Sequence, residues 1–313
     1  MTSFGLDDLP WSESLLSATA IETSLDALCE RLEVVAARNE GIKAHDSYFE
    51  LPRFGALTLS DILYSQISPG ISTTIRRRAQ RWLDRVGTFG DHGIPLEVTW
   101  SGHSLLAPTV SWAHERCRSG RPTACVTVPV SARRMGVSVL SAAGEQIVHF
   151  APDEAAHVDF FRKVVEAPGC DIAKFETTAG HAYPNLAFVP GVFRGLRDLS
   201  RPFRDRRDEI CRTLSIISDN VSAIFESPKE KAIAEALHSL GLDASTETRE
   251  TILDGKCRTA RERVFGAKTL VFDWHVKIDP FVDRIHLHPP IAESQWRPIV
   301  GIFHSHLPLP GDL

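Results

Sequence analysis

Apolar and polar residues alternate near the end of the chain with the period of two that is typical of a β-strand. In a strand, successive side chains point to opposite faces, so each such segment has one apolar and one polar face. The pattern predicts one strand over 272–278 and a second over 284–288. The predicted apolar face carries Phe272, Trp274, Val276, Ile278, Ile285 and Leu287, and the predicted polar face carries Asp273, His275, Lys277, Arg284, His286 and His288.

The two strands are expected to form a hairpin around a loop at 279–282. A register shifted by one residue would mix charged and apolar side chains on each face, so the pattern selects one pairing. A third strand is expected over 299–307, which completes a three-stranded antiparallel sheet with a histidine-rich face. The selected register places Lys277 opposite Arg284, His275 opposite His286, and Asp273 opposite His288.

Helical periodicity and capping residues predict most of the chain before this sheet. A long helix is expected to begin after a cap at Ser12 or Ser14 and to end near Arg38. Short apolar alternations predict strands at 96–100 and 124–130, and a hairpin made of 136–140 and 146–150. Further helices are expected over 57–65, 74–86, 105–118, 153–165, 192–219 and 229–240.

These elements together predict an α+β protein. We expect a mainly helical N-terminal region over 1–120 and an α/β middle region over 121–190. The C-terminal region, 191–313, is expected to contain helices followed by the histidine-rich antiparallel sheet.

Composition is that of an ordinary globular protein, with 313 residues, 43% of them hydrophobic, and a formal net charge of −5. We expect no signal peptide, and the sequence has no apolar run of about 20 residues, the length that spans a bilayer. Its six cysteines form no C-x-x-C pair, which argues against a zinc ribbon or a disulfide framework. We therefore expect a cytoplasmic protein that does not contact a membrane.

Arginines are concentrated in three segments, 76–85, 194–207 and 258–263. A local basic patch can bind phosphate groups even on an acidic protein. The alternative interpretation is that these arginines lie on solvated helix faces and pair with nearby Asp and Glu. In the third segment, the arginines that would contact a substrate are Arg258, Arg261 and Arg263.

The polar face of the predicted sheet has the residue types that metal-free RNA cleavage requires. Histidine serves as a general acid or base near neutral pH, and Lys and Arg stabilise the charge that develops on phosphate. The first hypothesis is a bacterial nucleic-acid-directed effector of toxin or phage-defence type, a ribonuclease without a cofactor. Its predicted catalytic residues are His275, Lys277, Arg284 and His286.

Three alternatives remain open. The face is solvated and inert if Asp273, Asp279 and Asp283 neutralise its cations. The chain is a non-catalytic subunit if the arginine segments and the sheet bind nucleic acid or an operon-encoded protein partner. The third alternative is a zinc-dependent hydrolase, because two His-x-His pairs on neighbouring strands offer four imidazoles. These ligands would be His286, His288, His304 and His306.

The last 45 or so residues resemble the final sheet of RelE/HigB-like bacterial ribonuclease toxins. In that family an arginine-led strand is followed, after a loop, by an apolar strand that ends in aromatic and basic residues. The segments 284–287 and 299–306 are similar to this layout. The same tail also resembles the ends of large uncharacterised bacterial proteins. The resemblance to the toxins implies ribonuclease activity.

Short motifs of several other enzyme classes are missing from the sequence. It contains no Walker A segment, no H-E-x-x-H and no G-x-S-x-G, and no G-x-G-x-x-G follows a predicted strand. These absences lower the expectation of an NTPase, a zincin, a serine hydrolase or a Rossmann dehydrogenase.

Overall fold

The computed structural model describes residues 3–65, 70–90, 93, 95–100, 102–130, 135–141, 144–278 and 282–311. The chain is an α+β protein, as the sequence predicts. It divides into two compact units, Met1–Phe160 and Phe161–Leu313. The boundary falls inside helix α5 (Glu154–Glu166) rather than near 120 and 190. The reason is that the expected middle region contributes strands to the sheet of the first unit.

The first unit contains a mixed sheet of eight strands in the order β5-β2-β1-β8-β10-β9-β6-β7. The first five strands in this order run parallel, and the last three are paired antiparallel. The region 1–120 therefore supplies strands as well as the expected helices. The strands are β1 (Ser3–Leu6), β2 (Gly41–His45), β5 (Gly87–Phe89), β6 (Glu97–Trp100), β7 (His103–Leu106), β8 (Ala124–Val126), β9 (Met135–Ser141) and β10 (Gly144–Ala151).

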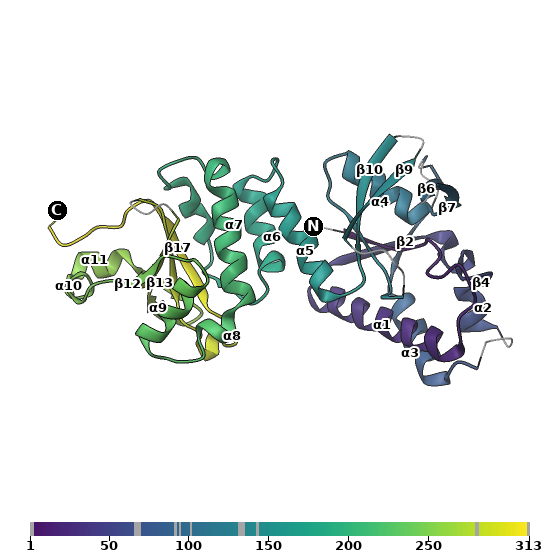
Figure 1. Ribbon diagram of the computed structural model, residues 1–313, viewed down its shortest axis with the longest axis horizontal. Coiled ribbons are helices and arrows are strands. Elements are labelled where there is room, and N and C mark those ends of the chain that lie inside the picture. The colour runs from purple at the N-terminus through teal and green to yellow at the C-terminus, as the bar shows by residue number, and fades with distance from the viewer. Residues whose placement is uncertain are drawn as a thin grey trace. The chain divides into compact units, whose positions relative to one another are not determined.

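Helices α1 (Ala18–Ala37) and α3 (Thr73–Leu83) lie side by side in this unit (Figure 1). Helix α1 begins at a cap formed by Ser17, whose side chain accepts a hydrogen bond from the Ala20 amide, and not at Ser12 or Ser14. The backbone of Ser12 is instead paired with residues 53 and 55. The remaining elements are η1 (Asp46–Glu50), β3 (Pro52–Phe54), β4 (Leu57–Thr58), α2 (Leu59–Tyr64) and α4 (Pro108–Arg118).

The second unit contains a five-stranded sheet in the order β11-β17-β16-β15-β12. Four of these strands form an antiparallel set, and β11 pairs parallel with β17 at one edge. The three predicted strands are thus the centre of a wider sheet. The strands are β11 (Ala187–Phe188), β12 (Ala244–Thr246), β15 (Trp274–Lys277), β16 (Arg284–His288) and β17 (Ile299–His304), and a separate hairpin consists of β13 (Glu262–Phe265) and β14 (Lys268–Val271).

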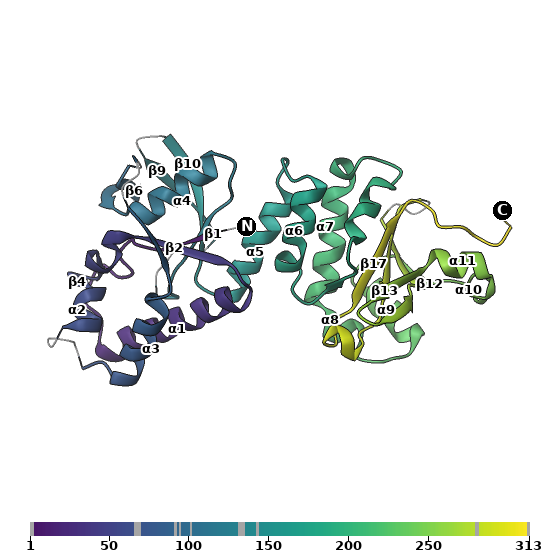
Figure 2. The ribbon, with the colours of Figure 1, turned by 180° about the vertical axis from the view of Figure 1, so that it is seen from behind.

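Helices surround this sheet in the second unit. Figures 1 and 2 show α7 beside β17 with α6 beyond it, whereas α10 and α11 lie at the far side of the sheet. The aromatic ring of Phe193 stacks on that of Phe303 with centroids 6.0 Å apart, which joins the preceding 3-10 helix to β17. The helical elements are α6 (Ile172–Ala182), η2 (Val192–Arg197), α7 (Phe203–Asp219), α8 (Val221–Ile224), α9 (Glu230–Ser239), α10 (Arg249–Leu253), α11 (Gly255–Ala260) and η3 (Ala292–Ser294).

The predicted register of the C-terminal hairpin is confirmed in its two inner pairs, His275 with His286 and Lys277 with Arg284. The apolar face is buried as expected, since Trp274, Val276, Ile285 and Leu287 are each at most 5% exposed. Burial of each such side chain stabilises the fold by about 1.5–3 kcal/mol. The predicted loop residues 279–281 lie outside the described part of the chain.

The outer end of the hairpin differs from the predicted register. The ladder stops at Trp274 opposite Leu287, so Asp273 does not pair with His288. Phe272 also lies before the strand, because its amide bonds the carbonyl of Arg261 at 2.9 Å. Its fully buried ring lies 6.0 Å from the ring of His288, on the histidine side of the sheet. The prediction that Phe272 shares a face with Trp274 is therefore wrong.

Strand β17 contains a β-bulge at Gly301. Ile302 lies opposite His286 and Val300 lies opposite Leu287, which leaves Gly301 as the extra residue. A Cβ atom at this position would overlap the ring of Phe272, so only glycine leaves room for that ring. The bulge thus allows the phenyl group to pack on the backbone of β17.

Candidate metal centre

The histidine face of the C-terminal sheet is buried rather than solvated. The side chains of His275 and His286 are 7% and 1% exposed, and their ring centroids are 5.5 Å apart. The segment 247–271, which includes α10, α11 and the β13–β14 hairpin, supplies Arg261 to this cluster. The sequence left a solvated face open as one alternative, because the strand pattern cannot show which segment covers it.

His286 has one nitrogen bonded to the backbone and one nitrogen without a partner. Its Nδ1 lies 3.1 Å from the carbonyl oxygen of Phe272, and a carbonyl can only accept, so Nδ1 carries the proton. Its Nε2 is buried and has no hydrogen-bond partner among the described residues. Burial, and then the neighbouring His275, lower the pKa of His286 to about 3. The imidazole is therefore neutral at pH 7, with a lone pair on Nε2.

His275 lies between a hydroxyl and a carboxylate. Its Nε2 is 3.1 Å from the Ser245 hydroxyl, and its Nδ1 is 3.4 Å from Oε1 of Glu247. Glu247 directly follows β12, and its amide bonds the carbonyl of Asp273 at 2.8 Å. The ladder between β12 and β15 thus positions the carboxylate beside the imidazole.

A buried guanidinium anchors the same carboxylate. Nε of Arg261 lies 3.0 Å from Oε1 of Glu247, and Arg261 is 1% exposed. Its other contacts are to the backbone carbonyls of Cys257 at 2.9 Å and Pro308 at 3.0 Å. Burial raises the pKa of Glu247, but hydrogen bonds and charges from His275 and Arg261 outweigh it and lower the pKa to about 2. Glu247 is thus ionised throughout the neutral range.

Glu247, His275 and His286 form a group whose potential ligand atoms all lie within 4.8 Å of one another. Two ligands bound tetrahedrally to zinc at its usual bond lengths are separated by about 3.4 Å. The 3.4 Å between Nδ1 of His275 and Oε1 of Glu247 matches this separation. Two imidazole nitrogens and one carboxylate oxygen are a donor set typical of zinc and of non-haem iron.

The surroundings also resemble those of metal ligands. A ligating histidine usually donates its other N–H to a carbonyl or carboxylate, as His286 does to Phe272. Arg261 would hold the Glu247 carboxylate in the same way, as an outer partner of the ligand. The positive charge of Arg261 also repels a metal cation at this site. The fit therefore depends on the unpartnered nitrogen and on the geometry, and not on net negative charge.

The predicted catalytic residues are brought together only in part. His275 and His286 meet, and Lys277 and Arg284 form the next pair along the same two strands. Nζ of Lys277 lies 3.0 Å from a carboxylate oxygen of Asp243, which neutralises it. Arg284 donates to the carbonyl of Val282 at 3.3 Å.

The predicted substrate-binding arginines have three different environments. Arg258 is on the surface and pairs with Glu262 at 3.0 Å, and Arg261 belongs to the buried cluster. Arg263 lines a small pocket, where its NH1 donates to the carbonyls of Ala260 at 3.0 Å and Glu262 at 2.7 Å. These three side chains therefore do not form a single patch.

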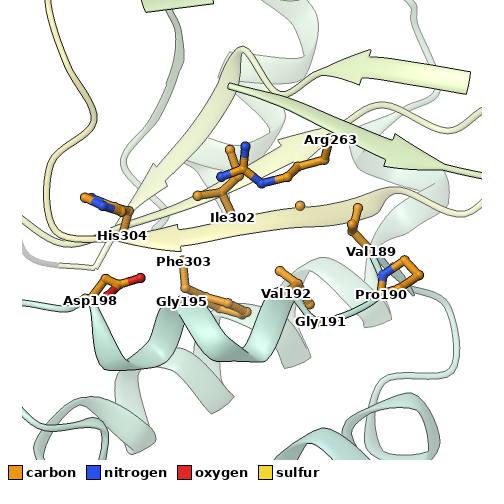
Figure 3. Close-up of a pocket in the computed structure, with 11 residues that line it drawn as sticks. Val189, Pro190, Gly191, Val192, Gly195, Asp198, Arg263, Ile302, Phe303 and His304 are labelled. Atoms are coloured by element: carbon orange, nitrogen blue, oxygen red, sulfur yellow. The ribbon is translucent and has the colours of Figure 1, made fainter. Parts of the chain in front are cut away.

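The pocket that contains Arg263 has a volume of about 180 Å³ and lies along the β17 segment from Gly301 to His304. Figure 3 shows the Arg263 side chain across Ile302, with His304 and Asp198 at one end and the loop residues 189–191 at the other. Ile302 is also the residue opposite His286 in the sheet. The pocket and the buried cluster thus involve the neighbouring strands β17 and β16.

The structure does not assemble the alternative zinc set. His304 lies opposite Arg284, and Ile302, not a histidine, lies opposite His286. Nδ1 of His288 lies 2.7 Å from the Pro289 carbonyl, and His306 is exposed. Within the described ranges, the only ligand group found is Glu247 with His275 and His286.

The acidic residues that were expected to neutralise the face are also placed differently. Asp283 is fully buried, and its carboxylate bonds Arg206 at 3.0 Å and Ser200 at 2.7 Å instead of a cation of the histidine face. Asp279 lies outside the described residues. Burial raises the pKa of Asp273, and its carbonyl, not its carboxylate, supports Glu247.

Glu247 and Ser245 are the site residues that the sequence did not reveal. Glu247 stands one residue before Thr248, which caps helix α10. The only local signal was the short alternation over 244–247, which ends in a carboxylate just before that cap.

Comparison of this chain with family models, with curated proteins and with solved structures finds no match. The resemblance to ribonuclease toxins therefore stays a prediction. Across the described residues, no helix combines the length and the apolar character needed to span a bilayer.

Proposed function

We propose that the C-terminal unit is a metal-dependent hydrolase in which Glu247, His275 and His286 hold one zinc-like divalent ion. The observation that carries this proposal is the buried Nε2 of His286, which has no hydrogen-bond partner and belongs to a group that includes a carboxylate. The proposal keeps the two central histidines of the predicted site. It replaces the other predicted groups with Glu247.

A buried polar atom without a partner destabilises a fold by about 1–3 kcal/mol. A metal ion at Nε2 of His286 would remove this cost, because the lone pair of a neutral imidazole is the form that binds metal. The site is buried, since His286 is 1% exposed, and an ion is small enough to enter it. The unpartnered nitrogen is therefore suited to binding a metal ion.

Three protein ligands leave a coordination position for water, which is typical of catalytic and not of structural zinc sites. Zinc held by these residues would lower the pKa of a bound water to about 7 and so would supply a hydroxide near neutral pH. The residues of this chain orient the ligands. Phe272 fixes the ring of His286, Ser245 fixes His275, and Arg261 fixes Glu247.

Phosphodiesters are the substrate class we propose, and a nucleic acid is the corresponding macromolecule. The support comes from the 180 Å³ pocket, which contains the guanidinium of Arg263 and the imidazole of His304. Arg284 lies opposite His304 in the sheet, so a second guanidinium belongs to the same neighbourhood. Guanidinium groups bind phosphate oxygens with charge-assisted hydrogen bonds.

Metal content tests the centre directly. The full-length chain is stripped with a chelator, reloaded with zinc, desalted and measured by elemental analysis, alongside Glu247→Gln and His286→Gln. We expect about one zinc per wild-type chain and a loss of most of it in both variants. His306→Gln and Glu250→Gln alter exposed residues of the same unit and serve as matched controls. A wild-type chain without zinc, or equal zinc in all five proteins, would contradict the proposal.

Activity is tested separately with single-stranded RNA and DNA and with a chromogenic phosphodiester. Zinc-loaded wild type should cleave, and His286→Gln and chelated wild type should not. Cleavage that persists in chelator but is lost in His275→Gln would support the metal-free mechanism instead. Metal binding without cleavage of any of these substrates would leave the centre in place and refute the substrate class.

A further inference from the structure

A second pocket of the C-terminal unit is large, aromatic and acidic. Its volume is about 670 Å³, which lies within the range of about 300–1,000 Å³ that is usual for small-molecule sites. It contains none of the proposed metal ligands. Its lining includes the aromatic residues Phe225, Trp274, His288 and Trp296, together with the acidic residues Glu230 and Asp273.

The two carboxylates are not paired with a lysine or an arginine of the described chain. Neither Glu230 nor Asp273 forms an ion pair with a Lys or Arg among the described residues, and the pocket lining contains no Lys or Arg. The two groups lie close enough for their charges to interact. Two like charges beside aromatic rings form an environment that attracts a cation.

Trp296 occupies an unusual backbone conformation at this pocket. Both Gln295 and Trp296 have positive φ angles, 55° and 60°, which are rare for residues other than glycine and are strained for a large side chain. Trp296 is nevertheless 71% exposed, so burial of its ring does not compensate for the strain. Strain of this kind is concentrated at ligand-binding sites.

The surrounding loop holds this conformation through hydrogen bonds. The hydroxyl of Ser294, a residue that is 1% exposed, contacts the carbonyls of Ile291 at 2.8 Å and Arg297 at 2.6 Å. The amide of Trp296 donates to the carbonyl of Ile291 at 2.9 Å. The loop is therefore built to keep the indole at the pocket and out of the core.

We propose that this pocket binds an organic cation, a guanidinium or alkylammonium group, between Trp296 and the carboxylates of Glu230 and Asp273. Trp is the ring that binds cations best through its face. Trp274 forms part of the pocket wall and is 5% exposed. The apolar lining contributed by Ile233, Leu270 and Pro289 suits the alkyl part of such a ligand.

The experiment compares two probes of the same shape, butylguanidinium, which is charged, and butylurea, which is neutral. Binding to the full-length chain is measured by calorimetry or by saturation-transfer NMR. We expect butylguanidinium to bind at least tenfold more tightly than butylurea. Trp296→Ala should weaken its binding about three- to tenfold, and Trp296→Phe should weaken it less. Asp273→Asn and Glu230→Gln should each weaken it about three- to tenfold.

Matched controls are available in the same unit. Leu253→Ala removes an apolar side chain that is 73% exposed, and Glu176→Gln removes an exposed carboxylate, and neither residue lines the pocket. Both should bind butylguanidinium like the wild type. Equal binding of the two probes, or unchanged binding in all pocket variants, would overturn the proposal.

A further arm identifies the source of the cation. An acetylated pentapeptide with one central arginine represents a protein partner, and spermidine represents a free polyamine. Competition with butylguanidinium by either compound supports the proposal and names the source. A failure of both to compete at tenfold excess would refute it. Zinc content is measured on the same samples, so a failure of the metal centre is seen separately.

Discussion

Acid should weaken the histidine face of the C-terminal unit through His286. The pKa of this imidazole is lowered from 6.5 to about 3 in the folded protein. Between these values the unfolded chain binds the proton and the folded chain does not, so stability falls as pH falls through this window. One pKa unit corresponds to 1.36 kcal/mol, so the metal-free protein should lose about 2 kcal/mol between pH 7 and pH 5.

Hydrogen–deuterium exchange measures this loss locally, which avoids treating two units as a single transition. The amides of β15 and β16 are followed in the presence of chelator, with rates corrected for the intrinsic effect of pH. We expect their opening to become about thirtyfold more frequent between pH 7 and pH 5, which is the equivalent of about 2 kcal/mol. His286→Gln, which cannot titrate, should not show this increase.

His306→Gln is the control, since it removes an exposed imidazole from the same unit. It should retain the wild-type response to pH. The reasoning would be refuted if His286→Gln and the wild type lost protection equally on acidification. It would also be refuted if protection in the wild type were constant over this range.

Three other outcomes follow from the structure. Burial raises the pKa of Asp8 from 3.8 to about 6, so the folded chain takes up a proton between pH 7 and pH 5 that the unfolded chain does not. The amides of β1 and α4 should therefore gain about 1 kcal/mol of protection against hydrogen exchange on acidification, and Asp8→Asn should not show this gain. Arg261→Met leaves the Glu247 carboxylate buried without its guanidinium and should lower the free energy of unfolding in urea by about 3–5 kcal/mol. The double variant Arg261→Met, Glu247→Leu should regain much of this stability. Gly301→Ala should lower the free energy of unfolding by about 1–3 kcal/mol, because the added methyl group meets the ring of Phe272. Gly180→Ala should leave stability unchanged or raise it, because an added Cβ at that position meets no other atom.

The sequence could predict the pairing of β15 with β16 because both strands alternate cleanly and only one register keeps their apolar residues together. Helix α1 was predictable for a similar reason, since its apolar stripe is long. The strands β1 and β2 were not predicted. Each has at most five residues, which is too short for a clear alternation of apolar and polar side chains.

The candidate site could be predicted only as far as the two histidines that share a hairpin. Glu247 and Arg261 reach the cluster from a segment that folds back over the sheet, and no local pattern specifies such a long-range contact. The exposure of a polar face is not a local property either. Strand alternation shows which residues share a face, whereas the covering segment decides whether water reaches them.

The bulge at Gly301 has a consequence for how this strand can change over time. Val300 and Phe303 are three positions apart, yet their strand partners Leu287 and Ile285 both belong to the apolar face. Removal of the one extra residue would place Val300 and Phe303 two positions apart, so a regular strand would still turn both toward the apolar face. A single-codon deletion at Gly301 would therefore keep core and cluster residues of β17 on their own faces. A one-residue insertion elsewhere in the strand would instead turn the side chains beyond it toward the opposite face.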